Sequence, residues 1–182
     1  MKHRTRGSER GSALIETALV LGMLLMLALG AFEYGMAFRE WLSVTNATRE
    51  GARLAAQAGD HTNADCLILE ATAGALQSLA ASQIQQVTIF ESDETGSFGS
   101  NQQRYRPAVA GDNPDLLVCD QGWFPLIETW PPSSRDNDGS VRDWIGVRLT
   151  FDHEWITGFL WWNGTVEWTD DTIMRMEPNY DF

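Results

Sequence analysis

The sequence predicts an α+β protein in which a long N-terminal helix, first a transmembrane anchor and then a stalk, carries a small antiparallel β-sheet on its outer half. Residues 13–32 form an apolar run whose only charge is Glu16. Helical spacing of apolar and small residues continues from this run to residue 58. Alternation of apolar and polar residues then predicts strands at residues 84–91, 141–154 and 165–176.

The apolar run is long enough to cross a bilayer, because 20 residues at 1.5 Å each span about 30 Å. It is longer than the apolar part of a secretory signal and has no clear small-residue exit site, so we expect a retained anchor. The predicted divisions are a basic leader (1–11), a transmembrane helix (12–38), a stalk (39–58) and an extracytoplasmic α+β domain (59–182).

Charge is distributed unevenly in this chain, whose formal net charge is -12. Four of 13 basic and one of 25 acidic residues precede residue 12, so the leader carries +3 and the remainder -15. Basic flanks stay on the cytoplasmic side of an inserting helix, so the acidic domain is expected outside the membrane. An acidic chain without clustered Lys and Arg has no surface for nucleic acid, and no nucleic-acid partner is expected.

Glu16 is the unusual residue of the anchor. A carboxylate at the centre of a membrane helix costs about 2.5–3.5 kcal/mol on insertion scales, and less near its end, so such a residue indicates function by default. The alternative is a carboxylate that reaches the interface beside the leader. The run from Arg10 to Glu16, RGSALIE, resembles a prepilin processing site, with glycine before the cut and glutamate at mature position five.

That resemblance makes Gly11, Ser12 and Glu16 the candidate processing and assembly residues and implies a prepilin peptidase as a partner. The α-amino group of a cleaved Ser12 could then pair with Glu16 of a neighbouring copy. Major pilins usually have tyrosine after this glutamate, whereas this chain has Thr17, so an uncut signal anchor is the second possibility.

Further segments extend the resemblance. GSALIETALVLG, FEYG and ATREGARLAA, together with the terminal IMRMEP, resemble the TadE/TadG-like pseudopilins of the tight-adherence (Flp, type IVc) pilus system. The resemblance covers residues 10–58 and, more faintly, 173–178. It implies a pilin-like fold, a structural role and other pilins and an assembly platform as partners.

The only two cysteines, Cys66 and Cys119, follow the anchor. Exported thiols usually pair, which predicts a disulfide, and two buried free cysteines are the alternative. Neither has the spacing of a zinc ligand.

The outer domain is expected to begin with a helix at 64–82 and to contain a sheet of three or four strands. Residues 92–113 are expected to form a loop, 116–119 a short strand or buried loop, and 125–140 turns without regular structure. Four of the eight tryptophans fall at Trp155, Trp161, Trp162 and Trp168. They predict either sheet packing or an exposed aromatic patch for a partner protein or the membrane interface.

Motifs for catalysis and metal binding are incomplete. His153-Glu154 begins like a zinc-protease helix, but Thr157 stands where the second histidine belongs, so His153 is expected to be an ordinary strand residue. Asp136-x-Asp138-Gly139 lacks the remaining calcium ligands. No cofactor, no metal and no enzymatic activity are expected.

The sequence therefore predicts a pseudopilin or minor pilin in the inner membrane, single-pass, with its C-terminal domain outside and access to an extracellular pilus. The main alternative is a non-polymerising single-pass envelope protein whose outer domain binds a partner or ligand. An anchored hydrolase is the third, weaker hypothesis.

Overall fold

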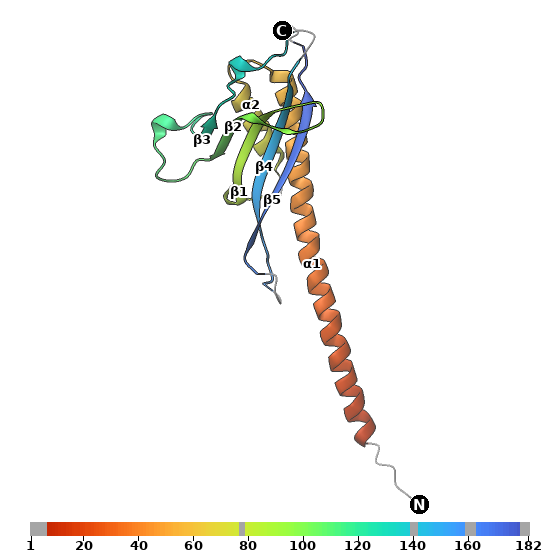
Figure 1. Cartoon of the computed structure of the whole chain (residues 1–182). Coiled ribbons are helices and arrows are strands. Elements are labelled where there is room, and N and C mark those ends of the chain that lie inside the picture. Colours follow the sequence, from red (N-terminus) through yellow and green to blue (C-terminus); the bar gives the residue numbers. More distant parts are fainter. Residues whose placement is uncertain (1–6, 77–78, 139–141, 159–162, 179–182) are drawn as a thin grey trace, which may run out of the picture. The chain divides into compact units, whose positions relative to one another are not determined.

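The structure is a computed structural model that describes residues 7–76, 79–138, 142–158 and 163–178 (Figure 1). The chain divides into two compact units, each described by itself. Unit 1 combines residues 1–38 with 155–164, and unit 2 combines residues 39–154 with 165–182. The long N-terminal helix and the antiparallel five-stranded sheet confirm the predicted α+β fold class.

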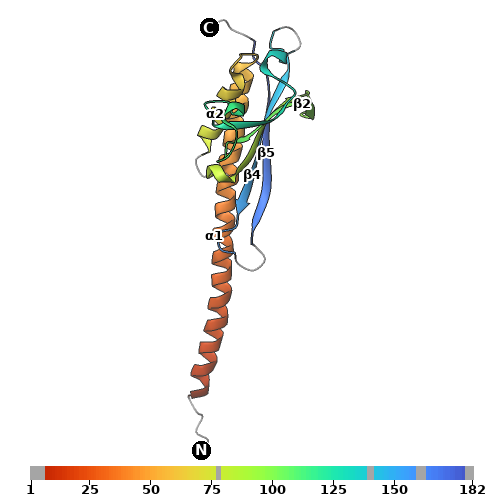
Figure 2. The same ribbon diagram turned by 90° about the vertical axis from the view of Figure 1, so that its left-hand side faces the viewer.

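Helix α1 runs without a break over Gly7–Ala58 and contributes to both units. It contains neither proline nor an internal break, which agrees with the continuous helical pattern in the sequence. In unit 2 its last twenty residues and the second helix, α2 (Ala64–Ala75), form one layer, and the sheet forms the other (Figure 2).

The sheet has the order β3-β2-β1-β4-β5, and all of its neighbours are antiparallel. Its strands are β1 (Ile84–Ser92), β2 (Phe98–Pro107), β3 (Trp123–Glu128), β4 (Trp144–Glu154) and β5 (Thr165–Arg175). Strand β1 is central, and β4 lies between β1 and β5, with Val147 opposite Ile89 on β1 and Thr172 on β5. The strands predicted near 84–91, 141–154 and 165–176 are confirmed.

The core of unit 2 lies between the helices and this sheet. Small residues on α1, such as Ala52 and Ala55, bring the helix close to fully buried β-branched and aromatic side chains such as Val147 and Phe151. Burial of these apolar side chains at about 25 cal/mol per Å² is the main favourable term for this layer packing.

The predicted second helix is too long. Helix α2 ends at Ala75, because Leu76 has a ψ of 89° and donates its N–H to Ala73, three residues back. A short 3-10 turn, η1 (Ala81–Gln83), then leads directly into β1. The chain must reverse before Ile84 to enter the sheet, and this tertiary requirement overrides the apolar helical pattern.

The prediction of a loop at 92–113 is wrong, because this region contains β2. The turn between β1 and β2 is stabilised by Asp93, whose Oδ1 accepts hydrogen bonds from the backbone N–H groups of Thr95 and Ser97 at 2.9 and 3.0 Å. The strand itself is polar, yet its backbone pairs with β1 on one side and β3 on the other. Hydrogen bonds from both neighbours stabilise a strand that shows little apolar alternation.

The prediction of irregular structure over 125–140 is wrong for its first residues, which belong to β3. Pro125 is tolerated because β3 is an edge strand and needs partners on one side only. The sheet therefore has five strands, not three or four. The 116–119 segment begins at the last residue of a 3-10 turn, η2 (Pro114–Leu116), and Val118 then bridges to Trp123, the first residue of β3.

Candidate functional site

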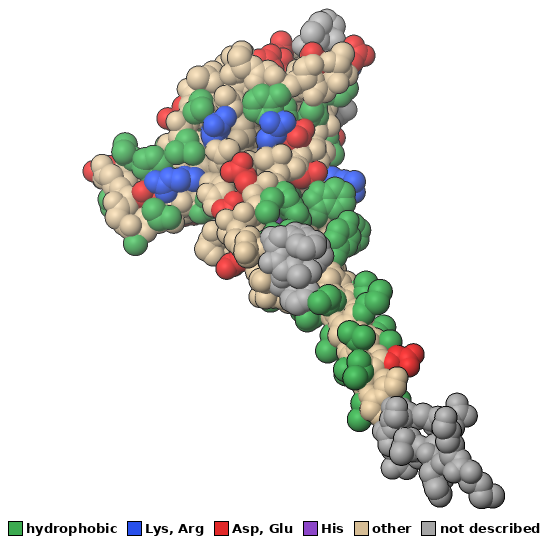
Figure 3. Space-filling model, turned by 60° about the horizontal axis from the view of Figure 1, so that its bottom comes forward, with side chains coloured by type: hydrophobic (Ala, Val, Ile, Leu, Met, Phe, Trp, Pro, Cys, Tyr) green, Lys and Arg blue, Asp and Glu red, His purple; other side chains and the backbone are tan. Residues whose placement is uncertain are grey.

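The first half of α1 exposes its apolar side chains. Every large apolar residue from Leu14 to Phe32 is at least 39% exposed. Among the described residues α1 is the one helix long and apolar enough to cross a membrane, with a mean hydropathy of 2.2 over a window that is 0% buried. Figure 3 shows hydrophobic side chains along this part of the helix. A surface of this kind, uncovered by protein, suggests a single-pass membrane protein.

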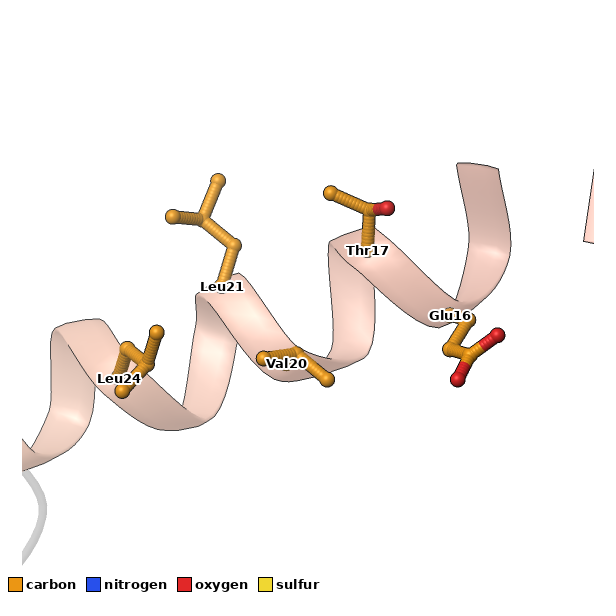
Figure 4. A pocket seen from close by; sticks show the side chains of 5 residues that line it. All are labelled: Glu16, Thr17, Val20, Leu21 and Leu24. Carbon is orange, nitrogen blue, oxygen red and sulfur yellow. The ribbon is translucent and has the colours of Figure 1, made fainter. Parts of the chain in front are cut away.

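Glu16 lies on this exposed helix. Together with Thr17, Val20, Leu21 and Leu24 it lines a shallow groove along the helix surface (Figure 4). The hydroxyl of Thr17 donates to the carbonyl oxygen of Ala13 at 2.8 Å, so this polar side chain is satisfied within the helix and is compatible with lipid. Glu16 is therefore an ionisable side chain on an otherwise apolar surface.

The other two candidate processing residues, Gly11 and Ser12, lie on the same helix just before Glu16. Ser12 and Glu16 are four residues apart and so share one face of α1. No atom outside the local helix backbone lies within 4 Å of a Cβ placed at Gly11. The three residues are thus close together and uncovered, and cleavage after Gly11 stays a prediction.

Glu33 follows the apolar run and was not predicted as a site residue. Its side chain is only 1% exposed, although it sits beside Phe32 at 54% and Tyr34 at 73% exposure. The backbone N–H of Thr157, in the connection between β4 and β5, donates to its two carboxylate oxygens at 3.2 and 3.3 Å. Unit 1 therefore contains a direct contact between α1 and the Trp155–Gly164 connection.

The part of α1 that belongs to unit 2, residues 39–58, presents a face of small residues to the rest of that unit. The residues buried on this face include Ala47, Gly51, Ala52, Ala55 and Ala56. A Cβ added at Gly51 would overlap Thr72 Oγ1 and lie 3.2 Å from Val147 Cγ1. The small residues of the ATREGARLAA segment therefore permit close approach of α1 to α2 and β4.

His153 is not the ordinary strand residue that the sequence predicted. It is 0% exposed, and its Nδ1 lies 2.7 Å from Oε2 of Glu40 on α1. Its ring stacks on Trp168 with centroids 4.9 Å apart and an interplanar angle of 7°. The Glu40–His153 contact links α1 to the end of β4. The seven-residue spacing of Glu33, Glu40 and Ala47, which places them on one helix face, was the sequence signal that could have indicated burial of Glu40.

A second buried polar network lies at α2. Asp65 accepts a hydrogen bond from Arg135 Nη2 at 2.5 Å and another from the Tyr105 hydroxyl at 2.7 Å. Burial, and then the adjacent carboxylate of Asp65, raise the pKa of the Tyr105 phenol. The phenol therefore stays a hydrogen-bond donor, and the network ties α2 to β2 and to the segment before β4.

Cys66 and Cys119 form the predicted disulfide, which joins α2 to the segment that precedes β3. The three residues Cys119, Asp120 and Gln121 all have positive φ, between 54° and 64°. Non-glycine residues rarely adopt this conformation, so the crosslink helps to hold a backbone that local preference disfavours.

The carboxylates of Asp136 and Asp143 accept hydrogen bonds from backbone N–H groups of the 136–138 segment. Asp136 Oδ1 accepts the N–H of Asp138 at 3.0 Å, and the N–H of Asp136 donates to Asp143 Oδ2 at 2.7 Å. Over the described part of the chain, no three His, Cys, Asp or Glu side chains gather as a metal ion would require.

The tryptophan-rich region contributes partly to sheet packing. Trp168 packs edge-on against Phe151, with centroids 5.8 Å apart, as well as on His153. Trp161 and Trp162 lie outside the described residues.

Comparison with known families gives one match. The model of the family described as TadE-like protein matches residues 11–53, which confirms the resemblance over most of residues 10–58. No curated protein and no solved structure matches the chain significantly. The match associates the chain with a tight-adherence pilus system and with a family that is typically non-catalytic.

Proposed function

We propose that this chain is a pseudopilin, or minor pilin, that acts in assembly of a tight-adherence type pilus and performs no catalysis. The observation that carries the proposal is the TadE-like segment, residues 11–53, with the ionisable Glu16 on the exposed apolar surface of α1. A non-polymerising anchor has no need of a carboxylate at this position, because leucine would insert at lower cost.

Glu16 is the proposed assembly residue. After cleavage between Gly11 and Ser12, the new α-amino group and the carboxylate of a neighbouring copy form a charge pair in the membrane. Each charge is costly alone in a low-dielectric medium, and pairing them offsets that cost. The pair therefore favours lateral association of helices over isolated anchors.

The proposed location is the inner membrane, with the leader in the cytoplasm and residues 59–182 outside. The leader charge of +3 supports this orientation, and the Cys66–Cys119 disulfide supports an oxidising compartment for the outer domain. The partners are other pilins, the inner-membrane assembly platform, a prepilin peptidase and membrane lipid. The domain bounds proposed from the sequence, 12–38 for the membrane helix and 39–58 for the stalk, go with this assignment.

Two measurements test the proposal together. Mass spectrometry of the native protein should find a chain that begins at Ser12. Glu16→Ala should abolish pilus assembly, counted by electron microscopy, while the protein still accumulates in the membrane. Thr17→Ala is the matched control in the same helical turn, because it removes only a hydroxyl that bonds within the helix. Normal piliation in the Glu16→Ala strain would contradict the proposed role.

The non-polymerising anchor is the second candidate, and two observations favour it. Thr17 departs from the usual pilin residue, and α1 begins at Gly7, so the bond after Gly11 lies inside a helix. In that case the leader would be intact in the native protein, and substitution of Glu16 would leave piliation unchanged.

A further inference from the structure

The contact between Glu33 and Thr157 fixes the β4–β5 connection to one level of α1. Both carboxylate oxygens of Glu33 accept the same backbone N–H, at 3.2 and 3.3 Å, and the side chain is almost fully buried. The connection is closed by a bond from the N–H of Trp155 to the carbonyl oxygen of Gly164 at 3.3 Å. Residues 155–158 therefore lie beside the helix at residue 33.

Residue 33, where the connection contacts α1, directly follows the end of the apolar run. Residues 13–32 span about 30 Å as a helix, which matches the hydrocarbon thickness of a bilayer. If they cross it, residue 33 lies at the boundary with the headgroups. Tyr34, 73% exposed, occupies the next position, and amphipathic aromatic residues are enriched at this boundary.

The connection has the chemistry of an interfacial segment. Residues 155–164 contain no charged side chain, although 21% of the whole chain is charged, and three of these ten residues are tryptophan. In the described part, Ile156 directs an apolar side chain outward with 57% exposure. An uncharged segment rich in apolar and aromatic residues gains free energy in the interface and loses none by desolvation of charge.

We propose that residues 155–158 are a second membrane contact of this chain, in the headgroup region of the leaflet that faces the outer domain, with Glu33 as the positioning residue. The inference rests on the transmembrane role of α1 that the proposed function includes. It adds that the protein touches the bilayer through a loop as well as through its anchor, and that this loop limits how far the helix can slide or tilt.

The carboxylate of Glu33 has a specific part in this arrangement. A carboxylate at the membrane boundary is costly when it has no partner, and the N–H of Thr157 provides one. The same hydrogen bond holds the β4–β5 connection against α1. A glutamine at this position keeps an acceptor oxygen, whereas an alanine removes it.

Spin-label accessibility in the full-length protein tests the proposal. Both cysteines are in the disulfide, so one introduced cysteine carries the label. Ile156→Cys is the test site, Leu24→Cys, 56% exposed, marks the anchor, and Val109→Cys, 61% exposed, is the apolar control from unit 2. Each variant is reconstituted into vesicles of phosphatidylethanolamine and phosphatidylglycerol, and collision with oxygen and with a water-soluble nickel chelate is measured.

The label at 156 should be several-fold less accessible to the nickel chelate than the label at 109. Its depth in the bilayer should be smaller than that of the label at 24. If the label at 156 is as accessible to nickel as the label at 109 while the label at 24 is buried in lipid, the inference is overturned, and the transmembrane role proposed for α1 still holds. Low access of both reagents to 156 would indicate contact with protein and would also overturn it. If 24 itself is open to nickel, the anchor and the proposed function fail together.

Glu33→Ala combined with Ile156→Cys should raise nickel access at 156 several-fold, and Glu33→Gln should restore the original value. An unchanged depth in the alanine variant would overturn the positioning role. A protein that is merely destabilised by the change would alter the label at 109 as well, so that site serves as the control.

Discussion

His153 on β4 and Glu40 on α1 are joined by a 2.7 Å contact between Nδ1 and Oε2, 113 residues apart in sequence and both almost fully buried. This polar contact connects α1 near residue 40 to the end of a strand in the sheet. The sequence predicted an ordinary strand residue at His153 and assigned no role to Glu40.

Replacing Glu40 with alanine should destabilise unit 2, because the buried contact between His153 Nδ1 and the Glu40 carboxylate would be lost. Loss of a buried hydrogen-bond partner costs about 1–3 kcal/mol, measurable as a lower urea midpoint of unfolding in detergent micelles. Glu70→Ala, an exposed acid on α2, is the control and should change stability by less than about 0.5 kcal/mol. Additive effects of Glu40→Ala and His153→Ala in the double variant would contradict the coupling of this pair.

Gly51→Ala should destabilise unit 2 by about 1–3 kcal/mol, because the added methyl group overlaps Thr72 Oγ1 and presses on Val147. Gly74→Ala in α2 is the matched control. A Cβ there meets no atom within 4 Å, so helix propensity alone should stabilise the protein, by up to about 1 kcal/mol. Thermal unfolding followed by circular dichroism distinguishes the two variants, and equal shifts would refute the close-approach role of Gly51.

Replacing both Cys66 and Cys119 with serine should lower the free energy of unfolding by about 2–5 kcal/mol. The crosslink closes a sequence separation of 53 residues and restrains the unfolded chain, and it also holds the positive-φ segment at Cys119. The check is urea unfolding of the oxidised protein against the double variant. An unchanged midpoint would show that neither restraint contributes.

The pKa of Asp112 should be about 2 in the folded protein, because Arg106 and then the backbone N–H of Val109 hydrogen-bond its carboxylate. This lowered pKa means that the folded state resists protonation. The stabilisation from Asp112 is therefore complete above its ordinary pKa of 3.8 and is lost as pH falls from 3.8 toward 2.

Carbon-13 NMR of the side-chain carboxyl groups in micelles can measure this value directly. In the Arg106→Gln variant the pKa of Asp112 should rise toward 3.8. Asp93, lowered to about 2 mainly by the Thr95 hydroxyl and the Ser97 amide, is the internal control and should not move. A change at both residues would indicate general unfolding instead of loss of one ion pair.

Local pattern was sufficient for the elements whose residues repeat with one clear period. The helix to residue 58 and strands β4 and β5 were predictable, because the burial of one face imposes that period on the sequence. Strand β2 was not predictable from local pattern, because its stability comes from the two strands that flank it. Strand β3 was not predictable either, because proline disfavours strands and Pro125 is tolerated only at the edge of the sheet.

The candidate site shows the same division. Glu16 was recognisable from sequence because a charge inside an apolar run is visible locally. In the sequence, Glu33 and Glu40 look like ordinary helix carboxylates. The folded structure shows that Glu33 accepts a hydrogen bond from Thr157 and that Glu40 contacts His153.

The sequence by itself predicted the apolar run, the long helix, the disulfide and the TadE-like character of residues 11–53, because each depends on neighbouring residues or on composition. The tertiary structure alone decided the five-strand order, the buried pairing of His153 with Glu40, and the attachment of Thr157 to Glu33. The two side-chain contacts join residues 113 and 124 positions apart. The free energy that selects such contacts comes from burial and partner geometry, which no local window of sequence contains.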